Sequence, residues 1–151
     1  MARQNTILIV DDSTTTRKKI GMAVASLGHT VLFAENGPAA LRITAEHPID
    51  VILLDIIMPE MDGFDVLQRL KANPQTQMIP VIVISGVEDR MSGVVRAIEL
   101  GAEDFLPKDF ERVLLNARIA ACIAKKRVRD LETDYLRLML DWVPADASPA
   151  I

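Results

Sequence analysis

Short apolar runs alternate with amphipathic stretches along most of this chain. One run, Val51–Leu54, leads into Asp55, and the turn-forming pairs Met58-Pro59 and Asp62-Gly63 follow it. A run this short, apolar on both faces and bounded by turn residues, indicates a strand buried in a parallel sheet. The same pattern recurs, and strands are expected at Thr6–Val10, Thr30–Ala34, Asp50–Leu54, Pro80–Ile84 and Asp104–Leu106.

The stretches between these runs place apolar residues three or four positions apart, which is typical of amphipathic helices. Gly28 and Gly101 follow two of the stretches as expected helix stops. Helices are expected at Ser13–Leu27, Gly37–Glu46, Gly63–Asn73, Glu88–Leu100 and Glu111–Val143. Since parallel strands need crossover connections, the alternation predicts an α/β fold: a five-stranded doubly wound parallel sheet with an elongated C-terminal helix.

Composition narrows the class of protein. The 151 residues are half apolar, which is ample for a core, and the formal net charge of −4 gives no basic surface for direct binding of nucleic acid. No apolar run is long enough to cross a membrane, and the N-terminus lacks the apolar segment of a signal peptide. The single cysteine, Cys122, allows no internal disulfide and is expected to serve packing. These features favour a cytoplasmic location.

Polar side chains follow four of the five strands where each strand ends. Asp11 and Asp12 follow the first, Asp55 the third, Ser85 the fourth and Lys108 the fifth, and these ends meet in one crevice. Three carboxylates this close repel each other unless a cation lies among them, and an all-oxygen set suits Mg²⁺. Lys108 and the Ser85 hydroxyl would supply a positive charge and a donor for a phosphoryl group. The alternative is an ordinary surface ion-pair network around Lys108.

These residues, in this order, resemble the receiver domain of two-component response regulators over about residues 5 to 122. Each motif alone is weak, but the ordered set at successive strand ends is specific. The motifs are Asp11-Asp12, Asp55 with Met58-Pro59, Asp62-Gly63, Ser85-Gly86 and Phe105-Leu106-Pro107-Lys108. The resemblance implies a flavodoxin-like receiver fold and a regulatory domain rather than an enzyme. It also implies a sensor histidine kinase or a phosphotransfer protein as the phosphoryl donor.

The resemblance further implies a role for each site residue. Asp55 would be the phosphoacceptor, Asp12 a direct Mg²⁺ ligand, Asp11 a mostly water-mediated ligand, and Ile57 a ligand through its backbone carbonyl. Asp55 would itself also bind the metal.

The phosphoryl oxygens would contact Ser85, Lys108 and the backbone of Gly86. Phe105 would be the switch aromatic, although a plain core ring is an equal alternative for it. Phosphorylation would then reshape the face formed by the fourth helix, the fifth strand and the fifth helix.

The sequence departs from the usual pattern of this family in two respects. Asp109 stands where a proline after a cis peptide bond is common, and a cis bond without proline costs roughly 2.5–4 kcal/mol. Either the site holds Asp109 strained, or the local backbone differs. Ile57 and Val87, which flank the expected path of the hydrolytic water, are both apolar and cannot orient it. We therefore predict slow self-dephosphorylation.

The C-terminal helix carries a heptad seam, which predicts a dimeric coiled coil with Arg127 facing Glu132 of the partner helix. The seam comprises Leu114, Ala117, Ala121, Ala124, Val128, Leu131, Tyr135, Leu138 and Trp142. Ile119 and Ile123 lie off it and are expected to pack on the sheet. The alternative is a single helix that folds back on its own domain.

These patterns divide the chain into three parts. A receiver domain is expected over residues 1–122, a helical extension over 123–143 and a disordered Ala/Pro-rich tail over 144–151. The basic run Lys125–Arg129 is expected to be a solvated helix face rather than a nucleic-acid patch. No output domain fits in the remaining residues, so the chain is either a fragment of a larger regulator or a free-standing one. His29 and His47 are expected to be surface or capping residues.

Three other classes stay open at this point. A phosphatase of the haloacid dehalogenase type also uses an Asp nucleophile with Mg²⁺, but it needs a second acid where Ile57 stands. A nucleotide- or flavin-binding domain needs a phosphate-binding loop after the first strand, where Asp11 and Asp12 would repel the phosphate. The third class is a receiver that has lost phosphorylation and serves only in dimerisation. The intact acid set argues against it.

Overall fold

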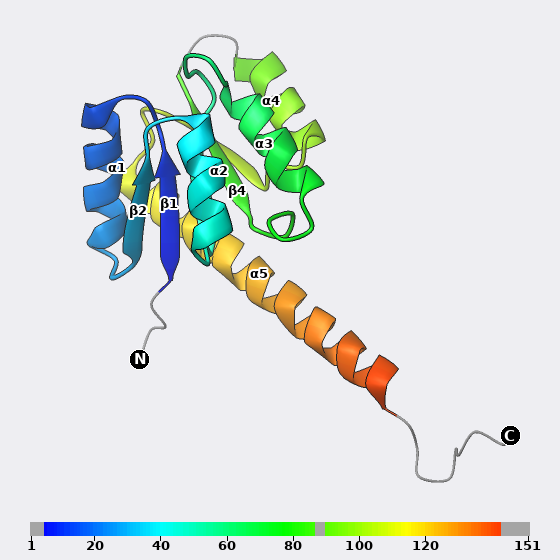
Figure 1. Cartoon of the computed structure of the whole chain (residues 1–151). Coiled ribbons are helices and arrows are strands. Elements are labelled where there is room, and N and C mark those ends of the chain that lie inside the picture. Colours follow the sequence, from blue (N-terminus) through cyan, green and yellow to red (C-terminus); the bar gives the residue numbers. More distant parts are fainter. Residues whose placement is uncertain (1–4, 87–89, 143–151) are drawn as a thin grey trace, which may run out of the picture.

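The computed structural model describes residues 5–86 and 90–142, and strands and helices alternate along them (Figure 1). The strands are β1 (Thr6–Val10), β2 (Thr30–Ala34), β3 (Val51–Asp55), β4 (Val81–Ser85) and β5 (Asp104–Pro107). The helices are α1 (Thr14–Ala25), α2 (Gly37–Glu46), α3 (Gly63–Ala72), α4 (Arg90–Glu99) and α5 (Arg112–Asp141). Each expected element is present in the described part of the chain.

The strands form one parallel sheet in the order β2-β1-β3-β4-β5. The chain moves outward from β1 to β2 and then returns to add β3 on the other side of β1. This reversal leaves a crevice outside the carboxyl ends of β1 and β3, where open α/β sheets bind their ligands. Asp11 directly follows β1, and Asp55 is the last residue of β3.

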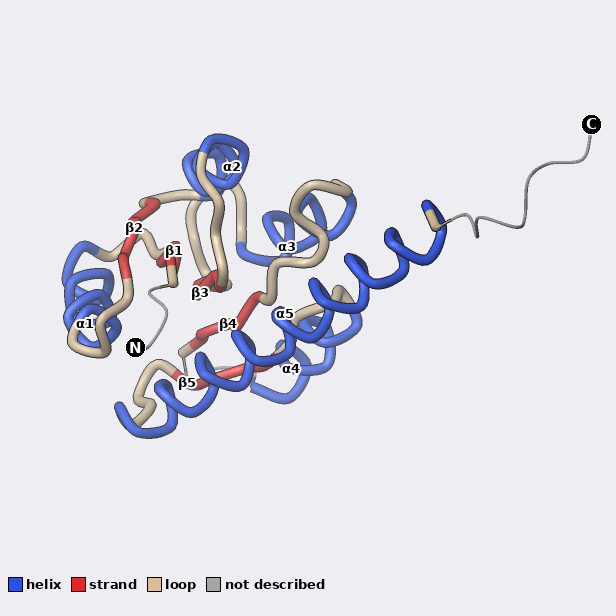
Figure 2. The backbone as a smooth tube through the Cα atoms, turned by 90° about the horizontal axis from the view of Figure 1, so that it is seen from below, coloured by secondary structure: helices blue, strands red, loops and turns tan. Residues whose placement is uncertain are grey.

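Helices cover both faces of the sheet, as a doubly wound fold requires. Figure 2 shows α2 and α3 on one side and α1 and α5 on the other. Ala97 of α4 packs in the same core as α2 and α3, whereas Ile20 of α1 and Leu115 of α5 pack in the second core. Strands β3 and β4 are buried on both faces, which explains why their apolar runs are continuous rather than alternating.

Local sequence signals set the helix ends. The side chains of Ser13, Asn36 and Asp62 accept hydrogen bonds from the first turns of α1, α2 and α3. Gly28 and Gly101 have φ angles of 88° and 102°, a conformation that favours glycine, and both lie in the turns that end helices as expected. Because Ser13 is a cap, α1 begins one residue later than predicted.

Several other element ends differ from the sequence prediction by a residue or two. Strand β3 begins at Val51 rather than Asp50, because the Asp50 carboxylate accepts a hydrogen bond from the Thr6 backbone N–H at 2.7 Å. Strand β4 extends to Ser85, which pairs with Pro107 of β5. The predicted start of α4 at Glu88 lies outside the described residues, as does Val87.

Helix α5 has two distinct parts. Leu115, Ile119, Cys122 and Ile123 are buried in the core, so the expected packing of Ile119, Cys122 and Ile123 is confirmed. Beyond them the helix runs away from the sheet (Figure 1), and every residue from 130 to 142 is exposed. The alternative in which this helix folds back on its own domain is therefore wrong. Val143 and the expected tail at 144–151 lie outside the described residues.

No helix in the described ranges is both long and apolar enough to cross a membrane.

Candidate functional site

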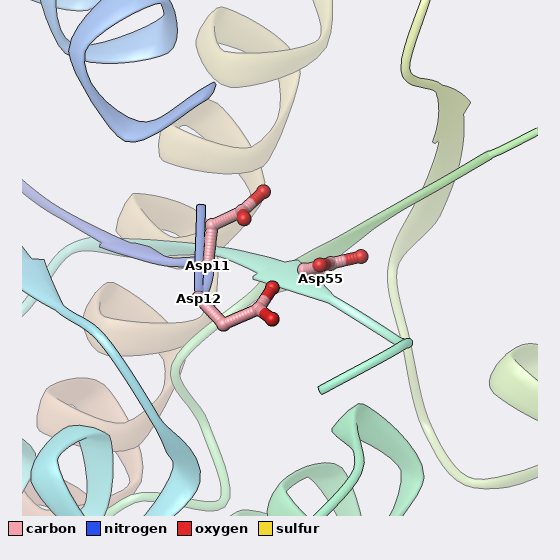
Figure 3. A group of neighbouring side chains, drawn as sticks. All are labelled: Asp11, Asp12 and Asp55. Atoms are coloured by element: carbon pink, nitrogen blue, oxygen red, sulfur yellow. The ribbon is translucent and has the colours of Figure 1, made fainter. Parts of the chain in front are cut away.

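Three carboxylates meet at the carboxyl ends of β1 and β3. Figure 3 shows Asp11, Asp12 and Asp55 grouped there, and one oxygen of each lies within 4.8 Å of the others. Asp11 and Asp55 are 1% and 2% exposed, whereas Asp12 is exposed to solvent. The arrangement offers two buried oxygen ligands and one accessible ligand, a donor set that suits a hard divalent cation.

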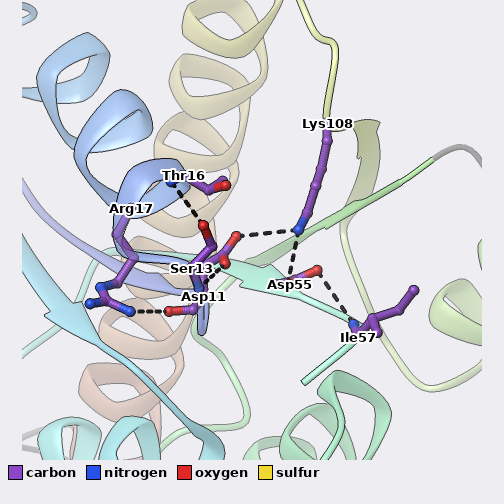
Figure 4. Close-up of polar contacts among 7 residues, drawn as sticks. All are labelled: Asp11, Ser13, Thr16, Arg17, Asp55, Ile57 and Lys108. Carbon is purple, nitrogen blue, oxygen red and sulfur yellow. Dashed lines mark hydrogen bonds and ion pairs between the residues drawn. The ribbon is translucent and has the colours of Figure 1, made fainter. Parts of the chain in front are cut away.

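Lys108 brings a positive charge to the same place from the end of β5. Its Nζ lies 3.2 Å from Asp55 Oδ2 and 3.6 Å from Asp11 Oδ2 (Figure 4). The Lys108 backbone N–H donates to the Ser85 carbonyl at 2.8 Å, which fixes the lysine beside the end of β4. No peptide bond among the described residues is cis, so the Lys108–Asp109 bond is trans and the local backbone differs from the family's common form. The ammonium nevertheless reaches both acids.

The electrostatics of the site centre on Asp55. Burial raises the pKa of this carboxyl to about 6, and the charge of Asp11 adds to the effect, while Lys108 partly offsets it. Burial by itself would lower the pKa of Lys108, but Asp55 and Asp11 outweigh it and the pKa is raised. Asp55 therefore ionises near neutrality, and the lysine beside it stays charged.

Two residues that the sequence analysis did not single out position Asp11. The Ser13 backbone N–H donates to Asp11 Oδ1 at 2.8 Å, and the Arg17 guanidinium donates to the Asp11 carbonyl at 2.7 Å (Figure 4). The Ser13 contact is the usual bond of an Asp side chain to the backbone two residues later. The Arg17 contact carries no sequence signal, because its acceptor is a backbone carbonyl that every residue possesses.

The loop after β3 holds Asp55 from the other side. The Ile57 N–H lies 3.4 Å from Asp55 Oδ1, and the Gly63 N–H donates to the Ile56 carbonyl at 2.7 Å. A Cβ atom at Gly63 would lie 2.3 Å from the Asp55 carbonyl oxygen, so only glycine permits this approach. The Asp62-Gly63 pair therefore serves two purposes, since Asp62 caps α3 and Gly63 lets that helix start against the loop. The Ile57 side chain is 65% exposed.

A cavity of about 380 Å³ adjoins this group between α3, α4 and β5. Ser85 and Phe105 both line it, and Phe105 is half-buried there rather than fully enclosed. The Arg96 guanidinium closes one side by lying 4.2 Å from the ring centroid of Phe64. A Cβ atom at Gly86, the residue after Ser85, would meet no neighbouring atom within 4 Å.

Comparison with known proteins decides the family. From residue 7 to residue 120 the sequence matches the family described as the response regulator receiver domain. The chain belongs to this family. Receiver domains are regulatory modules of two-component systems, and phosphorylation switches them. Membership of this family therefore excludes the alternatives of a phosphatase and of a flavin- or nucleotide-binding domain.

The proteins that are similar to this chain differ in length. The chain is 40% identical over 139 residues to a probable cyclic di-GMP phosphodiesterase of Vibrio cholerae, and the match covers 88% of this chain but only 30% of that protein. It is 36% identical over 118 residues to protein PilH of Pseudomonas aeruginosa, covering 78% of this chain and 97% of PilH. This chain thus spans less than a third of the first relative and nearly all of the second.

A crystal structure supports the fold independently. The signal receiver domain of a histidine kinase from Syntrophus aciditrophicus matches with a TM-score of 0.74 and 33% identity, covering 80% of this chain and 91% of that one. The expected five-stranded receiver fold and its extended final helix are therefore confirmed. Within the described residues, the acidic group Asp11, Asp12 and Asp55 can hold a metal ion.

Proposed function

We propose that Asp55 accepts a phosphoryl group from a phosphohistidine and thereby switches this receiver domain. The observation that carries the proposal is the position of Asp55, which is buried at the end of β3 between Asp11 and the Lys108 ammonium. A carboxylate oxygen of Asp55 would attack phosphorus as the P–N bond breaks, and the imidazole would leave with the bonding electron pair and take up a proton. The product is an aspartyl phosphate.

Mg²⁺ is the metal we propose, because the donors are all hard oxygens and a phosphoryl group would share it. Asp11, Asp12, Asp55 and the backbone carbonyl of Ile57 would hold it, with Asp11 acting mostly through water. Bound there, the metal would neutralise negative charge on the transferred oxygens. Lys108 adds a second positive charge at the acids.

Ser85 and Gly86 complete the proposed phosphoryl site, through a hydroxyl and a backbone N–H. Phe105 shares a cavity with Ser85, so a shift of Ser85 toward a phosphoryl oxygen would change the space open to this half-buried ring. We propose that Phe105 turns inward in response and alters the face formed by α4, β5 and α5.

The phosphorylation test uses acetyl phosphate and Mg²⁺ with intact mass as the measurement. The parent should gain one phosphoryl group that hydroxylamine removes, as expected of an acyl phosphate. Asp55→Ala should gain none, and Asp65→Ala, which changes an exposed acid of α3, should behave as the parent. Equal phosphorylation of the parent and Asp55→Ala would exclude Asp55 as the acceptor, and no phosphorylation of either would support a receiver that serves only in dimerisation.

Release of the phosphoryl group should be slow. The exposed side chain of Ile57 offers no group that can position or deprotonate a water. Val87, the other apolar residue expected to flank the path of the water, lies outside the described residues. We expect the phosphoprotein to persist well beyond seconds after acetyl phosphate is removed. Ile57→Asn, which offers a hydrogen-bonding amide, should shorten its lifetime, and loss of the phosphoryl group from the parent within seconds would contradict this expectation.

The extension of α5 suggests how the signal leaves the domain. All nine predicted seam residues are exposed, including Leu131 at 67% and Leu138 at 70%. Such exposure is expected of a coiled-coil helix that lacks its partner helix. We propose that residues 123–143 pair with a second copy and pass the state of the receiver domain, residues 1–122, to an output domain or a separate partner. The Vibrio cholerae relative, more than three times as long as its matched part, supports the first of these routes.

A sensor histidine kinase or phosphotransfer protein is the phosphoryl donor we propose. The regulatory role makes this chain a phosphoacceptor rather than a turnover enzyme, whatever activity a longer relative has. The cytoplasmic location and the disordered tail at 144–151 stay predictions from the sequence.

A further inference from the structure

Asp12 differs from the other two acids of the site in how it is held. Asp11 Oδ1 accepts a hydrogen bond from the Ser13 backbone N–H at 2.8 Å, and Lys108 Nζ lies 3.2 Å from Asp55 Oδ2. The Asp12 carboxylate is exposed, and in the described part of the chain it makes neither a hydrogen bond nor an ion pair. It nevertheless points toward Asp55 (Figure 3). Since no contact holds the carboxylate itself, the backbone that carries Asp12 sets this direction.

Arg17 of α1 holds the backbone next to Asp12. Its guanidinium donates a hydrogen bond to the Asp11 carbonyl at 2.7 Å (Figure 4), and a second one to Thr14 Oγ1 at 3.2 Å. The first bond is short, as expected when the donor carries a charge. The second bond steadies the planar guanidinium that makes the first. Arg17 therefore connects the first turn of α1 to the residue that follows β1.

The Asp11 carbonyl belongs to the peptide unit that joins Asp11 to Asp12. A peptide unit is planar, so the direction of its carbonyl also sets the direction of the N–Cα bond of Asp12. That bond determines where the Asp12 side chain leaves the backbone. A rotation of this unit would redirect the Asp12 carboxylate, whereas the Asp11 carboxylate is held separately by the Ser13 N–H.

We infer that Arg17 is a positioning residue that strengthens metal binding by orienting Asp12. The inference rests on the proposed Mg²⁺ site and adds to it a residue that acts through the backbone. Partners that orient a metal ligand typically contribute roughly 10–100-fold to metal affinity. The positive charge of Arg17 has the opposite effect, because it repels a cation at the acids. Positioning and charge therefore predict opposite changes in affinity when the guanidinium is removed.

Arg17→Met removes the donor and the charge but keeps a long unbranched side chain. Amide shifts of the isotope-labelled chain during a Mg²⁺ titration give the dissociation constant without any phosphoryl donor. We expect Arg17→Met to bind Mg²⁺ on the order of tenfold more weakly than the parent. Lys18→Met removes the same charge from an exposed neighbour on α1 and should bind as tightly as the parent or slightly more tightly. Equal or tighter binding by Arg17→Met would overturn the inference.

Two further variants distinguish positioning from a general loss of structure. Arg17→Lys keeps the charge and a donor of similar reach, so it should recover most of the lost affinity. Asp12→Asn should itself weaken Mg²⁺ binding, and adding Arg17→Met to it should weaken binding little further, because the residue that Arg17 orients is then a poor ligand. A second tenfold loss in the double variant would overturn the inference, since Arg17 would then act other than through Asp12.

Urea unfolding in EDTA verifies that each variant is folded before metal is added. If Arg17→Met does not fold, Arg17→Gln replaces it in the same comparisons, because the amide of glutamine is too short to reach the Asp11 carbonyl. A parent that fails to bind Mg²⁺ would overturn the proposed metal site together with the inference. Equal binding by the parent and by the Arg17 variant would overturn the inference alone.

Discussion

Arg129, in the part of α5 that leaves the sheet, donates a hydrogen bond to Glu103, which directly precedes β5. Lys125 Nζ lies 3.7 Å from the same carboxylate, and Arg118 Nε lies 3.2 Å from Asp104, the first residue of β5. The start of β5 is thus bound to three turns of α5, through Arg118, Lys125 and Arg129. Because β5 also carries Phe105, a displacement of this strand would be transmitted to the extension.

Glu103→Gln should loosen the start of the extension. The carboxylate is 14% exposed, so its paired charges are only partly screened, and we expect a loss of about 1 kcal/mol in the free energy of unfolding. Backbone amides of residues 125–131 should exchange hydrogen faster. Lys126→Gln, which removes a surface pair with Asp130, is the control and should change neither quantity appreciably. Unchanged exchange in Glu103→Gln would show that packing alone fixes the helix.

Asp55 should make the metal-free protein less stable at neutral pH than in mild acid. Its pKa in the folded protein, about 6, lies above the ordinary value of 3.8, so the folded state binds its proton more tightly than the unfolded state. The resulting penalty is complete above pH 6, declines as the pH falls toward 3.8, and is absent below that value. Asp55→Asn removes it, and we expect a stabilisation on the order of 2 kcal/mol at pH 7.

Urea unfolding in EDTA at pH 7 and at about pH 4 measures this difference. The advantage of Asp55→Asn should be large at the higher pH and small at the lower one. Asp134→Asn, an exposed position on the extension, controls for loss of a charge. Added Mg²⁺ should stabilise the parent more than Asp55→Asn, because the carboxylate is then a ligand. An equal advantage at both pH values would contradict the burial argument.

Lys108→Ala should separate two roles of the ammonium. With the charge near Asp55 removed, phosphorylation by acetyl phosphate at saturating Mg²⁺ should slow by about 10²-fold, a typical cost of losing one preorganised positive group. Mg²⁺ should bind several-fold more tightly, because the ammonium no longer competes for the carboxylates of Asp11 and Asp55.

Intact mass over time gives the rate, and amide shifts during a Mg²⁺ titration give the affinity. Lys126→Ala, far from the acids on the surface of α5, should match the parent in both. A slower reaction with unchanged metal affinity would mean that Lys108 leaves the carboxylates when the metal arrives.

The sequence could predict the acid site because each of its members lies at, or just after, the carboxyl end of a strand. Once five parallel strands are expected, their carboxyl ends must share one edge, which brings Asp11, Asp55 and Lys108 together even though 53 residues separate the last two. Contacts to backbone atoms escape this reasoning. The bond from Arg17 to the Asp11 carbonyl depends on the exact approach of α1 to β1, which no spacing of residue types specifies.

The same contrast holds elsewhere in the chain. The spacing of Ile119 and Ile123 distinguishes the packed face of α5 from its exposed seam, because a helix repeats at 3.6 residues. The bond between Glu103 and Arg129 links a loop to a distant helix turn, and many charged residues on the surface would fit it equally well in the sequence. Long-range pairs of this kind are determined by tertiary geometry.

Gly63 and Gly93 should respond oppositely to the same substitution. A methyl group at Gly63 would strike the backbone of Asp55 and Ile56, at 2.3 Å and 2.6 Å, whereas the space around Gly93 in α4 is open. We expect Gly63→Ala to cost more than 2 kcal/mol, roughly the range for overpacking against backbone, and to slow phosphorylation. Gly93→Ala should stabilise by about 0.5–1 kcal/mol, because alanine favours the helix. Thermal unfolding compares the two, and destabilisation of similar size in both would argue against the close approach at Gly63.

Substitutions at Leu131 and Leu138 should show whether the extension pairs through its seam. Both are exposed in the single chain, and burying each in a coiled coil should contribute roughly 1.5–3 kcal/mol, which an aspartate would reverse. Leu131→Asp with Leu138→Asp should therefore give a monomer in sedimentation equilibrium. Leu140→Asp makes the same chemical change on the outer face of the helix, at a position 84% exposed, and should leave the dimer intact. If Leu140→Asp dissociates the dimer as strongly as the seam variants do, the helices pair through another face.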